Sequence, residues 1–236
     1  MGLDIVGPYF ARPSGFVFLT PEEQTLVARR CARPLAPSCV IGSGIEAPPP
    51  GDDVVAAAAG DGPFLLYLGR IDPNKGCGTL FRHFLDWQAQ GGAAVPLVLA
   101  GPANMPIPNH PLIRPLGQVD RPTRDALLAR ASLLVVPSPF ESLSMVLLEA
   151  WNRRVPALVN GRCRVLQGQA VRSGGALTYR NFDEFAQALG YLLGEPEVAR
   201  QLGRQGRAYV DREYRWPHVM ERLEGLLAAA GLAPGS

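Results

Sequence analysis

The chain has 236 residues, of which 47% are hydrophobic and 19% charged, and its net charge is +2. This composition excludes an intrinsically disordered chain and predicts one large domain, or one domain with part of another. No stretch approaches the roughly 18 consecutive apolar residues that a membrane span needs. The 22 arginines are scattered among acids, a pattern that argues against a nucleic-acid-binding surface.

The cysteines and the N-terminal sequence bear on the cellular compartment. The four cysteines show neither CxxC spacing nor nearby histidine pairs, which argues against a zinc site or a disulfide framework. The opening residues, MGLDIVGPYFARPSG, lack a basic segment followed by an apolar one, so we expect no secretion signal. We therefore expect a cytoplasmic protein with reduced thiols, either free or peripheral at the inner membrane face.

From residue 63 onward, continuous apolar runs alternate with amphipathic segments. An apparent strand at 39–46 and a connector rich in proline, alanine and glycine at 47–62 precede this pattern. Continuous apolar runs are typical of strands covered on both faces, and apolar residues three or four apart are typical of helices. In chain order, we expect strands at 64–68, 97–100, 112–116, 133–136, 157–159 and 176–179, helices at 79–89, 122–131, 142–152 and 165–171, and three further helical segments.

This alternation predicts an α/β fold with a doubly wound, Rossmann-like parallel sheet. Ligands of such sheets bind outside the carboxyl ends of the strands, so the functional residues should directly follow strands. Two motifs in the chain do so.

The first motif, LGRIDPNKGCG, follows the strand at 64–68. Gly69 permits a sharp turn, and Arg70 and Lys75 place two cations on a loop that leads into a helix. Lys75 is the only lysine in the chain. Two cations near a helix N-terminus suit a diphosphate, although an ordinary turn with two solvated charges would show the same sequence pattern.

The second motif, PSPFESLSMVLLEAW, follows the strand at 133–136. A helix beginning near Ser142 would direct the amides of Ser142, Leu143 and Ser144 towards an anion. Glu149 lies about 12 Å further along the helix axis than Glu141, at roughly 1.5 Å per residue. This separation is too large for a shared-proton pair and suits the two ends of one extended ligand. Either acid alone has an ordinary structural explanation, but this explanation is weaker for Glu149, which is flanked by apolar residues and should need a partner.

These motifs, with LGQVD between them and VPALVN after them, resemble the donor-binding half of glycosyltransferase family 4, which has the GT-B fold. The resemblance runs from about Pro63 to the C-terminus. It implies that residues 61–236, with the C-terminal helices, form a Rossmann-like domain that binds a nucleotide sugar. It also implies a retaining hexosyltransferase-type enzyme that needs no cofactor and no metal, and the lack of an Asp-x-Asp pair agrees with the latter.

The resemblance assigns roles to individual residues. Arg70 and Lys75 would hold the donor diphosphate, Glu141 the sugar hydroxyls and Glu149 the nucleotide ribose. Ser144 stands where the family often has glycine, beside the expected phosphates. The candidate catalytic residues are thus Arg70, Lys75 and Glu141, and the donor site adds Gly69, Gly117, Gln118, Val119, Ser142, Leu143, Ser144 and Glu149, with residues 117–119 edging the base.

The N-terminal part of the chain departs from the family pattern. Residues 1–60 resemble the last strand, helix and linker of the acceptor-binding first domain, and none of the three histidines is placed to replace its catalytic histidine. We therefore expect a fragment or the C-terminal half of a split enzyme, with the acceptor domain or a separate chain as its partner. If the missing part of the first domain normally covers Trp151 and Trp216, these side chains should be exposed.

Two other functions remain open. A non-catalytic nucleotide-sugar-binding or assembly module would need only the donor half. A GT-B nucleotide-sugar epimerase would share the fold, but the combination of GR…KG with E-x7-E speaks against it.

Overall fold

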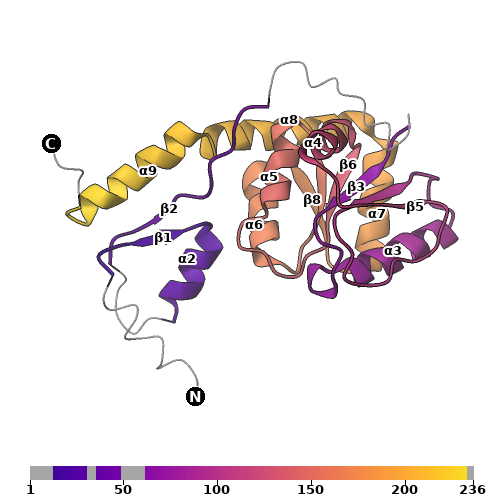
Figure 1. The fold of residues 1–236 in the computed structure, drawn as a ribbon, viewed down its shortest axis with the longest axis horizontal. Coiled ribbons are helices and arrows are strands. Elements are labelled where there is room, and N and C mark those ends of the chain that lie inside the picture. The colour runs from indigo at the N-terminus through magenta and orange to yellow at the C-terminus, as the bar shows by residue number, and fades with distance from the viewer. Residues whose placement is uncertain (1–12, 31–35, 49–61, 233–236) are drawn as a thin grey trace. The chain divides into compact units, whose positions relative to one another are not determined.

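The computed structural model describes residues 13–30, 36–48 and 62–232, which separate into two units (Figure 1). The sheet unit is Ala47–Val210, and the terminal unit joins Met1–Glu46 to Asp211–Ser236. Most of the connector expected at residues 47–62 lies outside the described residues. The sequence places all C-terminal helices in the donor-binding domain, whereas here the last of them groups with the N-terminal segment.

The sheet unit contains six parallel strands in the order β5-β4-β3-β6-β7-β8. The chain winds outward from β3 to β5, returns to β6 beside β3, and winds outward in the other direction. This arrangement confirms the predicted doubly wound, Rossmann-like α/β fold. The strands are β3 (Leu65–Leu68), β4 (Leu97–Ala100), β5 (Ile113–Gly117), β6 (Leu133–Val136), β7 (Ala157–Asn160) and β8 (Ala176–Tyr179).

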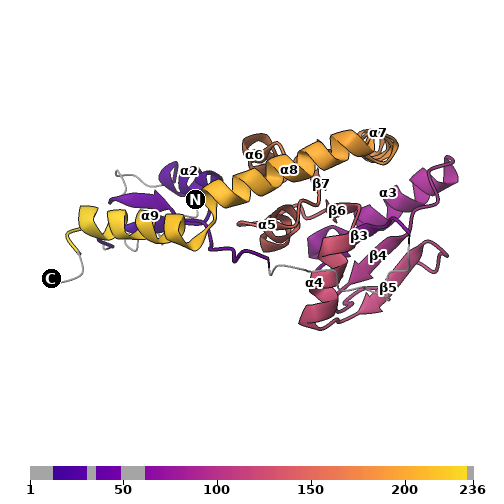
Figure 2. The same cartoon turned by 90° about the horizontal axis from the view of Figure 1, so that it is seen from above.

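Helices cover both faces of this sheet (Figure 2). On one face, α3 (Cys77–Ala89) packs beside α7 (Phe182–Gly194). The other face carries α4 (Arg121–Arg130), α5 (Met145–Asn152) and α6 (Arg164–Ser173). The chain continues through α8 (Pro196–Glu213), and no helix among the described residues is long and apolar enough to cross a membrane.

The apolar strands supply a core on both sides of the sheet. Leu65 and Tyr67 of β3 join the core beneath α3 and α7, where Phe84 and Phe185 are fully buried. His83 of α3 is 9% exposed and lies against the ring of Phe185, with ring centroids 5.5 Å apart. His83 therefore packs among aromatic rings of the core, and its burial lowers its pKa below the usual value.

Trp151, expected to be exposed, is fully buried. Its indole Nε1 donates a hydrogen bond to the Gly175 carbonyl at 2.8 Å, and the ring of Tyr209 packs edge-on with centroids 6.0 Å apart. Gly206 of α8 lies so close that a Cβ there would come within 3 Å of the indole. The exposure prediction is wrong because α8 supplies the cover within the same unit.

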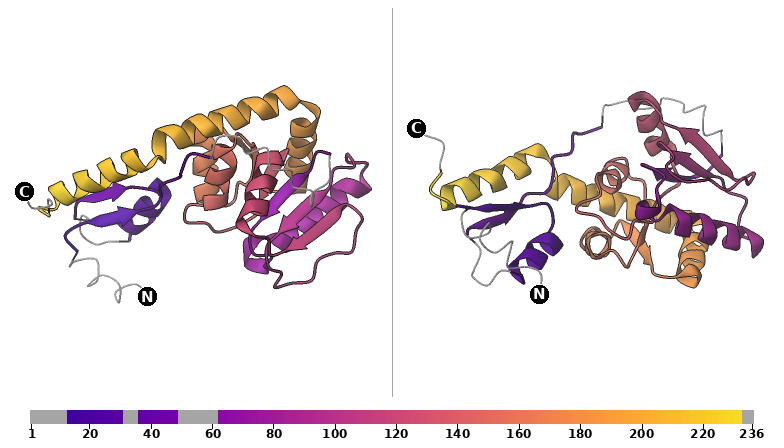
Figure 3. Two further views of the ribbon diagram at one scale, coloured as in Figure 1. Left: turned by 45° about the horizontal axis from the view of Figure 1, so that its top comes forward. Right: turned by 60° about the horizontal axis from the view of Figure 1, so that its bottom comes forward.

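The terminal unit contains a parallel pair of short strands and two helices (Figure 3). Strands β1 (Phe16–Phe18) and β2 (Ser38–Val40) are joined by α2 (Pro21–Ala28), and α9 (Trp216–Ala229) packs against β2. Trp216 is 46% exposed, as expected, although its ring also lies close to Gly44.

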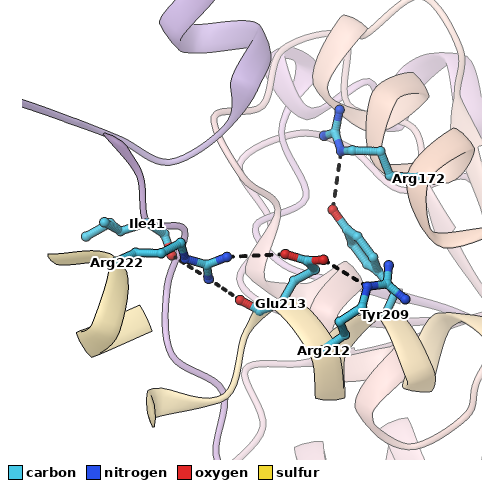
Figure 4. A network of polar contacts seen from close by, with 6 residues as sticks. All are labelled: Ile41, Arg172, Tyr209, Arg212, Glu213 and Arg222. Atoms are coloured by element: carbon cyan, nitrogen blue, oxygen red, sulfur yellow. Dashed lines mark hydrogen bonds and ion pairs between the residues drawn. The ribbon is translucent and has the colours of Figure 1, made fainter. Parts of the chain in front are cut away.

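Arg222 ties α9 to the segment after β2 in this unit (Figure 4). Its guanidinium donates to the Ile41 carbonyl at 3.2 Å, to the Glu213 carbonyl, and to the Glu213 carboxylate at 3.2 Å. The bonds to Glu213 fix the last helix to the end of α8, and the bond to Ile41 fixes it to a residue far away in the sequence.

Candidate functional site

The two predicted motifs meet where the strand order reverses. Lys75 follows β3 and Glu141 follows β6, and these two strands are neighbours in the sheet. Lys75 Nζ lies 2.9 Å from Glu141 Oε1, and the two side chains are 37% and 13% exposed. The pair therefore spans the crevice at which doubly wound sheets bind their ligands.

The loop after β3 is shaped by local caps and glycines. The Gly69 amide donates to the Ala100 carbonyl at 2.9 Å, and Gly69 has a φ of 144°. Asp72 caps a 3₁₀ turn over Pro73–Lys75 by accepting from the Asn74 amide at 2.8 Å, a bond that lowers the pKa of Asp72. This turn orients Lys75 towards β6.

Gly76 brings the two loops into contact. It has a φ of 76°, and a Cβ at this position would come within 3 Å of the Pro137 carbonyl. A larger residue would therefore push the loop after β3 away from the loop after β6. The glycine is what allows Lys75 to reach Glu141.

Arg70 presents its guanidinium to solvent, with 59% of its side chain exposed. Its backbone carbonyl accepts a hydrogen bond from the Tyr67 hydroxyl at 2.6 Å, and burial raises the pKa of Tyr67 above its usual value. Arg70 Nε lies 3.8 Å from Asp72 Oδ2. The backbone of Arg70 is thus anchored while its charge stays available to a ligand.

The loop after β6 differs from its prediction in one respect. The helix expected from Ser142 begins at Met145, three residues later. Ser144 takes a φ of 63°, which is left-handed and incompatible with an α-helix, so residues 142–144 belong to a loop. The expectation that Glu141 and Glu149 are separated along one continuous helix is therefore wrong.

This loop is nevertheless held in place and presents amides. The fully buried Gln169 of α6 donates from Nε2 to the Leu143 carbonyl at 2.6 Å, and Asn160 Nδ2 donates to the Pro137 carbonyl at 3.0 Å. Within the described part of the chain, the amides of residues 142–146 have no hydrogen-bond acceptor. The hydroxyl of Ser144 is buried and also lacks a partner among these residues.

Glu149, on α5, is paired with a residue that the sequence did not single out. Arg124 of α4 donates to Glu149 Oε2, and the Glu149 side chain is 23% exposed. Burial raises the pKa of Glu149, while the Arg124 charge opposes this rise. The sequence indicated that Glu149 needs a partner, but Arg124 could be identified only from the packing of α4 on α5.

The predicted base-edging segment lies at the end of β5. The Gly117 carbonyl accepts from the Gly101 amide at 2.8 Å, which ties the ends of β4 and β5 together. Gln118 is exposed and Val119 partly exposed, and Asp120 then caps α4 through the Thr123 amide at 2.9 Å. This segment therefore shares the carboxyl edge of the sheet with Lys75 and Glu141.

Sequence reasoning missed the residues that hold the site together. Gln169 and Asn160 position the loop after β6, and Arg124 positions Glu149. Of these, only Asn160 carries a local signal, because it directly follows a predicted strand at the ligand-binding edge. Among the described residues, no group of three histidine, cysteine, aspartate or glutamate side chains is arranged to hold a metal ion.

The sequence and the fold of this chain both match known proteins. Residues 62–195, more than half of the chain, match the family described as glycosyl transferases group 1. The alpha-D-kanosaminyltransferase of Streptomyces kanamyceticus is 25% identical over 187 residues, which cover 73% of this chain and 47% of the relative. The chain thus spans about half the length of this curated relative.

Two solved structures show the same fold. Sucrose-phosphate synthase from Thermosynechococcus elongatus matches with a TM-score of 0.74 and 22% identity, over 97% of this chain and 62% of that chain. The Anabaena protein HepE, solved in complex with UDP-glucose, matches with a TM-score of 0.71 and 15% identity, over 96% of this chain and 67% of that one. These matches cover the half of the GT-B fold that contains the six-stranded sheet. The chain therefore belongs to the glycosyl transferases group 1, that is, glycosyltransferase family 4.

Proposed function

We propose that the sheet unit binds a nucleoside-diphosphate sugar and supplies the donor-binding half of a retaining glycosyltransferase. The observation that carries this proposal is the Lys75–Glu141 pair, 2.9 Å apart at the reversal point of the sheet. A cation and a carboxylate placed there suit a ligand with a diphosphate beside a sugar. The diphosphate would recruit Lys75 and leave Glu141 free to accept hydrogen bonds from sugar hydroxyls.

Transfer requires stabilisation of the diphosphate as it departs from the sugar. Arg70, Lys75 and the unpaired amides of residues 142–146 provide positive charge and donors at one edge of the sheet. Donors that are already oriented stabilise developing negative charge without reorganisation, so they lower the barrier to cleavage of the sugar–phosphate bond. No residue here needs to form a covalent bond to the sugar.

The remaining donor contacts follow the edge of the sheet. Glu149, oriented by Arg124, would accept hydrogen bonds from the ribose, and Gly117, Gln118 and Val119 would lie along the base. Ser142, Leu143 and Ser144 would face the phosphates. UDP is the first nucleotide to test, because HepE has been solved with UDP-glucose.

Most of the acceptor would be held by residues outside the sheet unit, in an acceptor domain or a separate chain. Residues 1–60 would then be the end of the acceptor domain and its linker. A second candidate function is a nucleotide-sugar-binding module without transfer activity. Such a module would need only the proposed donor contacts of the sheet unit.

A thermal-shift panel of UDP, GDP and their sugars tests the proposal. A ligand at a hundredfold excess over its Kd should stabilise the chain by about 2.7 kcal/mol. Lys75→Ala should weaken diphosphate binding by about 1.5–3 kcal/mol, the range for a hydrogen bond to a charged group. Lys75→Arg should cost less, because the charge remains but the compact ammonium is lost.

Arg82→Gln, on the exposed surface of α3, is the control for loss of one positive charge. It should leave the ligand-induced shift unchanged. If no nucleotide stabilises the wild-type chain, or if Lys75→Ala responds like Arg82→Gln, the proposed donor site is wrong.

A further inference from the structure

Three arginines lie beyond the proposed donor site on the same edge of the sheet. Arg162 and Arg164 follow β7, and Arg180 follows β8. Because all six strands are parallel, the ends of β7 and β8 lie on the same edge as Lys75 and Glu141. All three arginines are exposed, and none of them forms an ion pair with a carboxylate of the described residues.

The cluster is held by the backbone and by side chains of the same loops. Arg162 Nε donates to the Arg180 carbonyl at 2.7 Å, which brings the two loops together. The Arg162 amide donates to Asn160 Oδ1 at 2.9 Å, and Asn160 also donates to the Pro137 carbonyl at the start of the loop after β6. Asn160 thus links the segment after β7, which carries Arg162 and Arg164, to the loop that carries Glu141.

The carboxylate beside Arg180 is held by donors other than the guanidinium groups of this cluster. The nearby carboxylate of Glu184 accepts from the Arg180 amide at 2.8 Å and from the Asn181 side chain at 3.1 Å, so it is used by the backbone and the helix cap. Arg164 is the first residue of α6, whose first turn carries no acid. A cation at a helix N-terminus opposes the helix dipole, so the arrangement costs stability unless an anion binds there.

We infer that Arg162, Arg164 and Arg180 bind a phosphate group on the acceptor. This inference rests on the proposed donor site, which places the base at β5, the diphosphate at β3 and the donor sugar at β6. Neighbouring strands are about 4.8 Å apart, so the ends of β7 and β8 lie roughly 5 and 10 Å beyond the end of β6. The next group along the edge after the donor sugar is therefore the acceptor, and guanidinium groups recognise phosphate through paired N–H donors.

The phosphate could belong to a small sugar phosphate or to a lipid headgroup, and binding to each can be measured separately. Calorimetry with glucose 6-phosphate and with inorganic phosphate probes the first source. Sedimentation with phosphatidylglycerol vesicles, against phosphatidylcholine vesicles, probes the second. Each arm uses the full chain and the variant Arg164→Gln/Arg180→Gln, because neither side chain forms a hydrogen bond within the described part of the chain.

The control is Arg82→Gln/Arg204→Gln, which removes the same charge from exposed positions on α3 and α8. Glucose 6-phosphate could also occupy the diphosphate site, so each titration is repeated in the Lys75→Ala background. We expect binding of at least one phosphate probe to survive Lys75→Ala, to weaken at least tenfold in Arg164→Gln/Arg180→Gln, and to change less than twofold in the control.

The two proposals fail in different ways. If UDP binds but no phosphate probe does, or if Arg164→Gln/Arg180→Gln binds every probe as the wild type does, the arginine site is wrong and the donor site stands. If UDP does not bind while glucose 6-phosphate binds and depends on Arg164 and Arg180, the donor site is wrong and the arginine cluster is a phosphate site of another kind. If the affinity of the double variant for UDP falls as strongly as its affinity for glucose 6-phosphate, the cluster does not bind the acceptor phosphate specifically.

Discussion

At the scale of single residues, each glutamate of the site is paired with one cation. Glu141 pairs with Lys75 and Glu149 pairs with Arg124. The first pair has to open when a diphosphate takes the lysine, whereas the second can stay closed and present its other oxygen to a ribose. The two carboxylates should therefore respond differently to substitution.

Glu149→Gln should weaken UDP and UDP-glucose binding equally, by at least tenfold, because the ribose is common to both ligands. Glu141→Gln should leave UDP binding within about threefold and weaken UDP-glucose binding about tenfold, because only the sugar needs this carboxylate. Calorimetric titration of both ligands measures the difference. Glu197→Gln, an exposed acid of α8, is the control. Equal losses for both ligands in both site variants would contradict the assignment.

Ser144 combines a left-handed backbone with a buried hydroxyl that has no partner among the described residues. Ser144→Gly should raise the free energy of unfolding by about 1 kcal/mol, because glycine adopts this φ without strain and removes the hydroxyl. Denaturant unfolding measures this change. Ser132→Gly, where φ is negative, should lower the stability instead. If both substitutions destabilise the chain equally, Ser144 is not strained.

At the scale of elements, α8 covers the sheet unit through glycines. Gly206 leaves room for Trp151, and Gly203 lies against the Arg154 carbonyl. The sequence predicts α8 only as one of three further helical segments, so the close contact between Gly206 and Trp151 is known only from the structure.

Gly206→Ala should destabilise the chain by about 1–3 kcal/mol, although alanine is the better helix former, because the new Cβ meets the indole of Trp151. Gly190→Ala in α7 provides the matched control, since nothing lies within 4 Å of its Cβ position. That substitution should stabilise the chain by about 0.5–1 kcal/mol. Thermal or denaturant unfolding should show changes of opposite sign in the free energy of unfolding for the two variants. A stabilising Gly206→Ala would refute the close packing of Gly206 on Trp151.

The strands and most helices could be predicted because their signal is local. Leu97–Ala100 and Leu133–Val136 are apolar throughout, and both are strands with all four residues buried. The start of α5 could not be predicted, because Ser142 and Ser144 are both good caps and only the left-handed φ of Ser144 decides between them. Gln169 and Arg124 could not be predicted either, since their partners lie 26 and 25 residues away.

The position of the site was predictable for a topological reason. A strand-helix alternation implies parallel strands, and the motifs after β3 and β6 then share one edge. What the sequence could not show is that Lys75 and Glu141 contact each other, because that requires the chain to reverse its direction of winding between β5 and β6.

At the scale of the whole molecule, the residues proposed to contact the donor lie in one array of strands and helices within the sheet unit. The site can therefore form without an acceptor-binding partner. Positioning of the acceptor contributes about 7–11 kcal/mol to lowering a transfer barrier, and most of this contribution would come from outside the sheet unit. Donor binding and sugar transfer should accordingly be separable in this chain.

Calorimetric titration of UDP-glucose into the full chain, followed by analysis of the cell contents, tests this separation most directly. We expect saturable binding that weakens at least tenfold in Lys75→Ala, with the UDP-glucose recovered intact even when glucose 6-phosphate is present. Absence of binding by the wild-type chain would contradict the donor site, and efficient transfer by the chain alone would contradict the assignment of the acceptor site to a partner.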